Sequence, residues 1–428
     1  MSPLGVKKVS LGLGGALALF LGAPCPRSAH AQSPVTCVAR QLTSKTEPNA
    51  LNAAQSSRDS ALSWLRRLNP FLDGKALSAK IVDAEDSLMF FRSFVPNFYD
   101  ALKTSPLKIN ALAPLLRHAG WMLGDVHPGN FGAILLEDGS PVFTTNDLDD
   151  GGHGPLALDL LRFLSASRLA DSTLDPAEIV RAYGRGLGGA PADECDYVSR
   201  LLKKAKKDGQ RAPSAYFQSG SHELVRSVGV TRNVKGTVRK RFEKVLETLF
   251  PGQFELHDVV EVTRSKGGSG GLHRYRVLLK SRHRPNAERS WVVLEFKEMT
   301  ESGMSAFALP APPSPSERVK QGLAYTVGKA HSNLFRFAEV QGVPMTVRPR
   351  FEGNLNIDVP QVHRSDFTSL ILREAWKLGE IHSVSADDPA SYLRAIQRFP
   401  LDTWREVSED IAAGFDRVYN IVKTRHPD

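Results

Sequence analysis

The stretch GDVHPGNFG, residues 124–132, places an acid, an imidazole and an amide between two apolar runs. Asp125 and Asn130 are five residues apart, on a loop whose glycines allow the backbone to turn tightly. His127 lies between them and is expected to pack and hydrogen-bond so that it orients the loop, in preference to binding a metal. An acid and an amide at this spacing could serve proton transfer and metal binding, or they could form only a turn.

A predicted hairpin favours the first alternative. The segment FGAILLEDGSPVFTTND contains two apolar strands joined by an Asp138–Gly139 turn, and it ends at Asp147. Because a short hairpin returns the chain to its starting point, we expect Asp147 to lie close to Asn130. A carboxylate oxygen and an amide oxygen together suit a hard cation such as Mg²⁺. Asn130 and Asp147 are therefore predicted metal ligands, and Asp125 is left to accept a proton from an attacking hydroxyl group.

A second polar segment, TRSKGGSGGLHR, lies between two predicted strands, and Lys297 stands at the end of the next strand, VVLEFK. Backbone N–H groups of a glycine-rich turn can approach phosphate oxygens, and a lysine on the neighbouring strand adds a positive charge. Each feature alone is more typical of the protein surface, but together with the predicted base and metal ligands they complete the parts of a phosphoryl-transfer site. The residues expected to contact phosphate are Lys297, Gly267, Gly268, Ser269, Gly270 and Gly271.

The elements that would position these residues follow from the apolar periodicity. Residues 38–120 are predicted to be mostly helical, WMLGD to be a short buried strand, and PLALDLLRFLSASRLA to be a helix opening at Pro155. Residues 172–250 are predicted to be helical and basic, three antiparallel strands begin near His257, and the chain beyond 365 is again helical. The proline-rich stretch 309–316 is expected to be a loop. The pattern predicts a helix-rich α+β fold whose small antiparallel sheet carries the glycine-rich turn and the lysine.

The chain of 428 residues is longer than one typical domain. We expect one large unit with two lobes, or two coupled domains. The predicted divisions are a signal peptide at 1–31, a helical region at 32–120, a helical lobe with the catalytic loop and metal site at 121–250, a β-rich nucleotide-binding lobe at 251–360, and a helical region at 361–428.

The first residues have the pattern of a secretory signal peptide. Two lysines precede the apolar run LGLGGALALFLGA, and the small-residue motif AHA ends at Ala31, which predicts cleavage before Gln32 and export to the periplasm or medium. Lipid attachment at Cys25 ranks second, because Pro24 stands where a small residue is expected. The run is shorter than the roughly 20 residues that a membrane-spanning helix needs. No later segment is long and apolar enough, so we expect no transmembrane segment in the mature chain.

Two cysteines, Cys37 and Cys195, would remain after cleavage. An oxidising compartment could join them in a disulfide, or they could be two unrelated buried thiols, and the sequence leaves both alternatives open. Because the chain has no CxxC motif, a cysteine-rich zinc site is excluded.

The formal net charge of +9 is modest for this length. The basic residues concentrate in RLLKKAKKDGQR and KGTVRKRFEK, at residues 200–211 and 235–244. Runs of this kind are usually solvated helix faces, so no nucleic-acid partner is expected.

Several motifs together resemble a bacterial family called domain of unknown function 2252. They are GDVHPGNFG, VFTTNDLDDGGHGPLALDLLRFLSAS, VLEFKEMTESGMSAF, ERVKQG, MTVRP and LGEIHS. The resemblance runs from about residue 90 to the C-terminal helices, and the first two motifs are the most specific. That family is in turn similar to the aminoglycoside phosphotransferase and protein kinase-like superfamily, whose catalytic segment has an aspartate, four residues, an asparagine, a hairpin and an aspartate.

The resemblance implies roles for individual residues. Asp125 would be the catalytic aspartate, and Asn130 and Asp147 would bind Mg²⁺. Asp159, inside the following helix, would brace the catalytic loop; on an apolar helix face it needs a polar partner if it is buried. Lys297 would contact a phosphate of ATP or another nucleotide, under the turn at 266–271.

The resemblance also implies a protein kinase-like, two-lobed fold, but the chain order departs from the kinase pattern. In kinases the glycine-rich loop and the lysine precede the catalytic loop, whereas here they follow it, so the two lobes would be connected in permuted order. The expected acidic partner of Lys297 is Glu317, although Gln321 lies in the same predicted helix. The implied activity is magnesium-dependent phosphotransfer from a nucleotide to a hydroxyl acceptor.

Parts of the sequence also suggest two other classes of function. The triplet DVH also opens the metallophosphoesterase signature, which requires a later Gly-Asn-His; here the Gly-Asn pairs are followed by Phe131 and Leu355, so this class is rejected. The second alternative is not an enzyme. Because export predicts a compartment without an obvious ATP supply, a pseudokinase-like periplasmic protein that only binds a phosphate or nucleotide ligand stays open.

Overall fold

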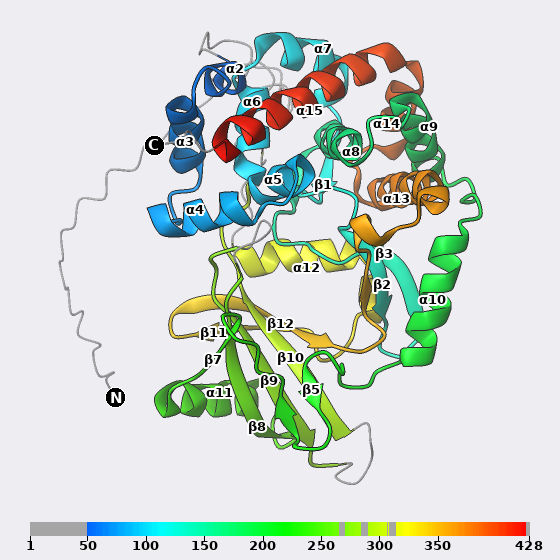
Figure 1. Cartoon of the computed structure of the whole chain (residues 1–428). Coiled ribbons are helices and arrows are strands. Elements are labelled where there is room, and N and C mark those ends of the chain that lie inside the picture. Colours follow the sequence, from blue (N-terminus) through cyan, green and yellow to red (C-terminus); the bar gives the residue numbers. More distant parts are fainter. Residues whose placement is uncertain (1–48, 265–269, 284–289, 306, 308–313, 425–428) are drawn as a thin grey trace, which may run out of the picture.

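The computed structural model describes residues 49–264, 270–283, 290–305, 307 and 314–424. The predicted signal peptide, Cys37 and the turn residues 267–269 lie outside these ranges. Within them, the chain forms a helical part and a six-stranded antiparallel sheet, which lie one above the other in Figure 1. The chain is a mixed α+β protein, as its sequence predicts.

The large sheet has the strand order β11-β12-β10-β9-β8-β7. Its central strands β8, β9 and β10 are the three that the sequence predicts, and β7, β11 and β12 extend the sheet on both sides. The bounds are β7 Thr231–Asn233, β8 Phe254–Val262, β9 Arg274–Ser281, β10 Trp291–Glu298, β11 Arg336–Val340 and β12 Val343–Arg350. Helix α12, Pro315–Thr326, connects β10 to β11 and lies between the sheet and the helical part (Figure 1).

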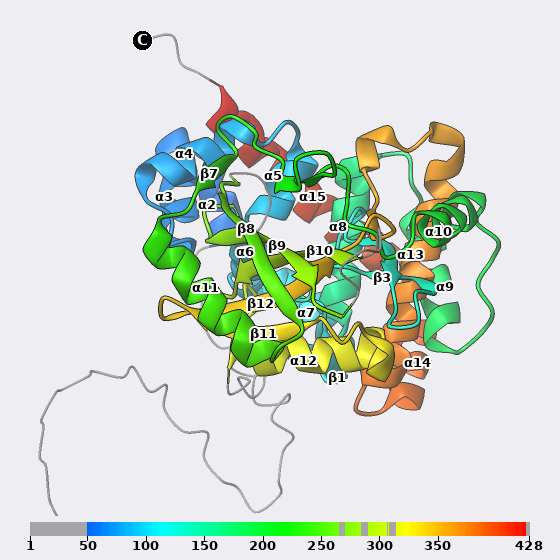
Figure 2. The ribbon, with the colours of Figure 1, turned by 90° about the horizontal axis from the view of Figure 1, so that it is seen from below.

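The two faces of the large sheet differ in chemistry, because successive side chains of a strand point to opposite faces. On one face Leu294 and Phe296 pack under helix α11, Gly236–Leu249, whose Phe242 ring lies 5.1 Å from that of Phe296. Figure 2 shows α11 along this side of the sheet. The other face carries charged residues of the same strand, Glu295 and Lys297, and this face borders the cleft described below.

Two smaller sheets hold the segment in which the sequence predicts the catalytic loop. Strands β2, Phe131–Leu135, and β3, Pro141–Thr145, form the predicted hairpin, and β13, Leu355–Asn356, pairs with β2. Strands β1, Ala119–Met122, and β4, Gly152–Pro155, form a second, two-stranded sheet. The loops at 123–130 and 146–151 therefore run between these two sheets and lie side by side.

The helical part is built around α8, Ala157–Ala170, whose residues from 157 to 167 are all buried. A helix surrounded on all sides in this way is expected to be mostly apolar, and the buried polar residues that it does carry need partners. Around it lie α9 Pro176–Leu187, α13 Arg364–Ser385, α14 Pro389–Arg398 and α15 Leu401–Lys423. Helices α9 and α13 approach so closely that a Cβ at Gly379 would lie 2.1 Å from the Tyr183 carbonyl oxygen.

Of the remaining helices, α2 to α7 precede the predicted catalytic loop in the chain, and α10 packs against the β2–β3 hairpin. They are α2 Ala50–Ala54, α3 Arg58–Leu68, α4 Gly74–Asp83, α5 Ser87–Ser93, α6 Val95–Lys103, α7 Pro106–Leu116 and α10 Asp196–Asp208, with short 3₁₀ turns at Gly328–Ala330 and Val359–Gln361. None of the helices in the described ranges combines the length and the apolarity needed to cross a bilayer.

One stretch differs from the sequence prediction. Residues 211–233, expected to be helical, form loops and short strands, β5 Phe217–Gln218 and β6 Glu223–Leu224 together with β7. Its serines, glycines and proline favour turns over helix. Buried Cys195, at the start of α10, has its Sγ 3.8 Å from the Ser369 hydroxyl oxygen.

Candidate active site

The predicted catalytic loop, residues 123–130, begins where β1 ends, and α8 fixes its backbone. The Asp159 carboxylate accepts hydrogen bonds from the N–H groups of Leu123 (2.6 Å) and Gly124 (3.0 Å). Gly124 has a φ of +79°, and a Cβ there would lie 2.1 Å from the Asp150 carbonyl oxygen, so no other residue fits. Asp159 thus contacts the loop backbone in the way that the sequence predicts for a bracing residue.

Asp159 is itself held by a buried polar chain. His382 Nε2 lies 3.2 Å from an Asp159 oxygen, and His382 Nδ1 lies 2.7 Å from the Tyr183 hydroxyl oxygen. Asp159 and His382 are both fully buried. Helices α8, α9 and α13 therefore all converge on the backbone of the catalytic loop.

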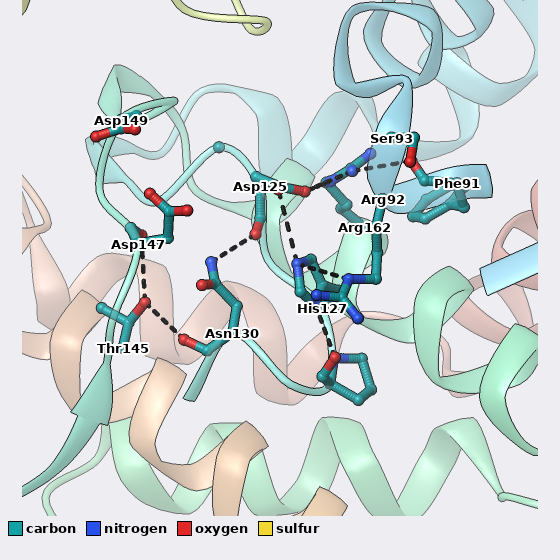
Figure 3. Close-up of polar contacts among 12 residues, drawn as sticks. Phe91, Arg92, Ser93, Asp125, His127, Asn130, Thr145, Asp147, Asp149 and Arg162 are labelled. Atoms are coloured by element: carbon teal, nitrogen blue, oxygen red, sulfur yellow. Dashed lines mark hydrogen bonds and ion pairs between the residues drawn. The ribbon is translucent and has the colours of Figure 1, made fainter. Parts of the chain in front are cut away.

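Asp125 lies at the turn of the loop and is paired with an arginine that the sequence did not reveal. The buried Arg162 guanidinium donates to one Asp125 oxygen, with Nη2 at 2.6 Å and Nε at 3.2 Å (Figure 3). Burial alone would raise the pKa of Asp125, but Arg162 and then His127 outweigh it and hold this pKa far below its usual range. Asp125 is therefore a carboxylate at any physiological pH.

Both ring nitrogens of His127 lie within hydrogen-bonding distance of protein groups. Its Nδ1 lies 2.7 Å from the Pro128 carbonyl oxygen, and Arg92 Nε lies 3.2 Å from its Nε2. Burial and the charge of Arg92 lower the pKa of His127, although Asp125 opposes this. Figure 3 shows the imidazole between Arg92 and Asp125.

Asn130 and Asp147 are brought together by the hairpin, as its length predicts. Phe131 pairs with Thr145, and the Thr145 hydroxyl donates to the carbonyl oxygens of Asn130 (3.0 Å) and Asp147 (3.4 Å). The Asn130 amide nitrogen donates to the Asp125 carbonyl oxygen at 2.9 Å. This bond fixes the amide, and the two side chains lie next to each other in Figure 3.

Lys297 reaches this pair from the large sheet. Its ammonium group is 3.0 Å from both carboxylate oxygens of Asp147 and also forms an ion pair with Asp149. Burial opposes ionisation of Asp147, but Lys297 and Arg348 outweigh it and lower the pKa of this residue. For Asp149 the balance is reversed: burial and the charge of Asp147 raise its pKa, although Lys297 acts in the opposite direction. One ammonium group thus faces two carboxylates, which leaves negative charge for a cation.

The donor atoms present fit a magnesium ion that completes its shell elsewhere. Within the described ranges, no group of three or more His, Cys, Asp or Glu side chains could hold a metal by itself. Mg²⁺, however, is usually bound through one or two carboxylates together with substrate phosphates and water. Asp147, with the Asn130 amide oxygen beside it, would supply the protein's share of such a site.

These side chains border one cleft between the sheet and the helical part, with a volume of about 350 Å³. Asp125, Asn130, Asp147 and Lys297 all line it, so the four residues converge as their assignment requires. Residues 84–178 and 203–415 match a protein family described as "Uncharacterized protein conserved in bacteria (DUF2252)". The chain belongs to this family. No curated protein and no solved structure matches it.

The matched segments of this DUF2252 protein contain every residue of the predicted site, but the structure does not bear out the acidic partner predicted for the lysine. Glu317 lies in α12, but its carboxylate is 3.6 Å from Lys320 at the surface, and the structure gives Lys297 other carboxylates, those of Asp147 and Asp149. The contact expected between Lys297 and Glu317 is therefore not made, because α12 turns the next residue, Arg318, inward instead. Arg318 donates to the carbonyl oxygens of Asp149 and Thr300.

Of the glycine-rich turn, Gly270 and Gly271 are within the described residues, and Gly267, Gly268 and Ser269 are not. The Gly271 N–H donates to the Arg264 carbonyl oxygen at 2.8 Å, and Arg264 lines the cleft. A phosphate contact by this turn stays a prediction.

Sequence reasoning missed Arg162, and it assigned no role to Arg92, Arg348 or His382. Arg162 is fully buried and its guanidinium carbon lies 4.4 Å from the centre of the Phe91 ring. A signal was present, because an arginine one turn after Asp159 in an otherwise apolar helix requires a buried partner. That this partner is Asp125 follows only from the way α8 packs against the loop.

The Asp150 carboxylate of this DUF2252 protein should make its stability depend on pH. Burial and the charge of Asp125 raise its pKa to about 6, although the Gly303 N–H, 2.7 Å away, opposes the rise. Because this pKa is above the unfolded value of about 3.9, the contribution of Asp150 is fully present below about pH 4 and is lost as the pH rises through 6. Because asparagine does not ionise, we expect Asp150→Asn to remove this pH-dependent decrease in the free energy of unfolding, which amounts to about 1–3 kcal/mol.

Urea unfolding from pH 4 to pH 8 measures this effect. The free energy of unfolding of Asp150→Asn, minus that of the unchanged protein, should become more favourable as the pH rises, mainly between pH 4 and pH 7. A difference that is constant across this range would contradict the assignment.

Proposed function

We propose that this protein is a magnesium-dependent phosphotransferase that moves a phosphoryl group from a phosphate-bearing donor to a hydroxyl group, and that it acts after export, as the predicted signal peptide indicates. ATP or another nucleotide is the donor that the kinase resemblance implies. The observation that carries the proposal is the convergence of Asp125, Asn130, Asp147 and Lys297 on one cleft from separate parts of the chain.

The arrangement of the sheet supports a kinase-like fold. In protein kinases the phosphate-contacting lysine lies on the third strand, after a glycine-rich loop between the first two strands, and a helix follows. Lys297 lies on β10, the third of three consecutive antiparallel strands; the glycine-rich turn connects β8 to β9, and α12 follows. These elements come after the catalytic loop in the chain, which is the permuted order that the proposal requires.

Each residue has a defined task in the proposed reaction. Lys297 holds donor phosphate oxygens, and Asp125 accepts the hydrogen bond of the acceptor hydroxyl and then its proton. Mg²⁺, held by Asn130 and Asp147 together with donor phosphate oxygens, would neutralise charge that develops during transfer. Because little bond formation to the attacking oxygen is needed in the transition state, a weakly basic Asp125 that orients the hydroxyl is sufficient.

One observation favours a second candidate function, a non-catalytic periplasmic protein that binds a phosphate ligand. Arg162 holds Asp125 so firmly as a carboxylate that this residue is a poor proton acceptor. Both candidates require ligand binding at Asp147, and turnover separates them.

Calorimetric titration tests the shared requirement. A triphosphate ligand, added as ATP and separately as inorganic tripolyphosphate, should bind in the presence of Mg²⁺ and not in EDTA. Asp147→Ala should weaken binding by at least about tenfold, the loss that even outer-shell partners of a metal cause. Asp193→Ala removes an exposed carboxylate far from the cleft and should bind normally. If neither ligand binds, or if Asp147→Ala binds normally, both candidate functions are wrong.

A further inference from the structure

The charged face of the large sheet carries five arginines that the proposed mechanism does not use. Arg274 and Arg276 lie on β9, Arg348 and Arg350 on β12, and Arg264 follows β8; all five line the cleft. We call these five residues the arginine wall. In the sheet register, Glu295 stands opposite both Arg276 and Arg348, so the wall surrounds this one carboxylate and continues to Lys297.

Glu295 neutralises only part of the wall. One of its oxygens lies 2.8 Å from Arg274 Nη1 and 2.6 Å from Arg348 Nη2. Despite burial, these arginines and Arg350 hold the pKa of Glu295 well below its usual range. Five guanidinium groups thus surround one carboxylate, and the remaining positive charge faces the cleft.

The other three arginines have no carboxylate partner among the residues that the structure describes. Arg276 stacks on the Tyr216 ring, 3.9 Å from its centre, and its buried Nε has no hydrogen-bond partner in the described ranges. Arg350 Nη2 is 3.3 Å from the Tyr216 hydroxyl oxygen, and Arg264 is exposed at the cleft. Although burial opposes it, Arg350 lowers the pKa of Tyr216, as a positive local potential must.

The same face offers little room for a nucleotide base. Its apolar part is covered by the chain itself, because Phe217 and Leu224 pack there against Leu278, Trp291 and Val293. Among the cleft residues that the structure describes, Phe71, His127 and Tyr216 carry aromatic rings; Arg276 covers the Tyr216 ring, and His127 is buried. Sites for flat organic ligands are lined mainly by apolar and aromatic side chains, whereas this face presents guanidinium groups.

We propose that the donor in this cleft is an inorganic polyphosphate chain, held through its phosphates by the arginine wall and by Lys297. Arg350 pairs with Val293, which lies four residues before Lys297 on β10. Four residues of a strand span about 13 Å, which is long enough for several phosphates in a row. Guanidinium groups bind phosphate oxygens in pairs of charge-assisted hydrogen bonds. The chemical step rests on the proposed function, and the inference adds the class of the donor.

The transfer balances without a further reactant. The acceptor hydroxyl oxygen forms a bond to the terminal phosphorus as the last P–O–P bridge breaks. The electron pair of the broken bond stays on the polyphosphate, which is one phosphate shorter, and the hydroxyl proton passes to Asp125 and then to water.

A titration that compares ligands with and without a base tests the inference on the full chain. In Mg²⁺, tripolyphosphate should bind at least about tenfold more tightly than ATP. ATP carries the same number of phosphates but one negative charge fewer, and the charged face offers its base no apolar or aromatic surface to stack on. Adenosine should not bind. ATP binding as tightly as tripolyphosphate, or more tightly, would overturn the inference while the proposed function stands. Absence of magnesium-dependent binding by either ligand would overturn both.

Variants of the wall supply the second test. Arg276→Gln and Arg350→Gln should each weaken tripolyphosphate binding about tenfold to a hundredfold, since each removes charge-assisted hydrogen bonds. Arg336→Gln is the matched control, because Arg336 lies on β11 of the same sheet and does not line the cleft. Thermal melting without ligand separates binding from folding: Arg276→Gln should melt at the same temperature or higher, because it relieves repulsion in the wall. Normal tripolyphosphate affinity in both cleft variants would refute the assignment.

Discussion

Replacing Asp125 by asparagine is expected to abolish phosphoryl transfer and to leave magnesium-dependent donor binding nearly unchanged. In the proposed reaction the carboxylate would orient the acceptor hydroxyl and take its proton, and loss of such a group lowers kcat about 10²–10⁴-fold. Its side chain does not hold the donor, so the dissociation constant should change by less than about threefold. Release of phosphate from tripolyphosphate or ATP, with water as the acceptor, measures the rate, and calorimetry measures binding.

A second carboxylate–arginine pair provides the control for this substitution. Asp100 bonds to Arg67 at 3.0 Å and is as little exposed as Asp125, but it lies outside the cleft. Asp100→Asn should therefore lose some stability and keep its kcat. Equal rates for Asp125→Asn and the unchanged protein would show that Asp125 takes no part in turnover and would favour the non-catalytic binding protein.

Of the substitutions proposed for this protein, Asp159→Ala should cause the largest decrease in the free energy of unfolding. The Asp159 carboxylate accepts hydrogen bonds from two backbone N–H groups of the predicted catalytic loop and contacts His382. Asp159 and His382 are both buried. Removing one partner of a buried charged network costs about 3–5 kcal/mol. Urea unfolding measures this cost, and donor binding should weaken as well, because the loop that carries Asn130 loses its support.

Asp73 shows what burial adds to this cost. Its carboxylate also accepts a backbone N–H, that of Ala76, but at an exposed helix start. Asp73→Ala should cost only about 1 kcal/mol. If Asp159→Ala were no more destabilising than Asp73→Ala, the bracing role of Asp159 would be wrong.

The sequence predicted best those parts of the site that depend on local geometry. Asn130 and Asp147 are joined by a hairpin of fixed length, so their proximity follows from the turn at Asp138–Gly139. The three strands β8, β9 and β10 were predictable for the same reason, because alternation and turn residues are local signals.

Contacts set by the docking of distant elements were less predictable. Whether α12 turns Glu317 or Arg318 toward the cleft depends on a rotation of the helix by about 100° per residue, which weak periodicity does not determine. The arginine wall was also hidden, because its members come from β9, from β12 and from the segment after β8. They are separated by up to 86 residues in the chain and meet only through the pairing of the sheet strands.

The ion pairs of Lys297 have a consequence for how the cleft is filled. This ammonium group pairs with Asp147, the same carboxylate that a metal would need. In the proposed reaction, Asp147 would hold Mg²⁺ in place of the lysine, and the Lys297 ammonium group would then pair with a donor phosphate. Metal and donor each remove the obstacle to the other, so each should raise the affinity of the other by the same factor. Under the proposed function, Lys297 would thus serve as an internal counterion of Asp147 whenever metal and donor are not bound.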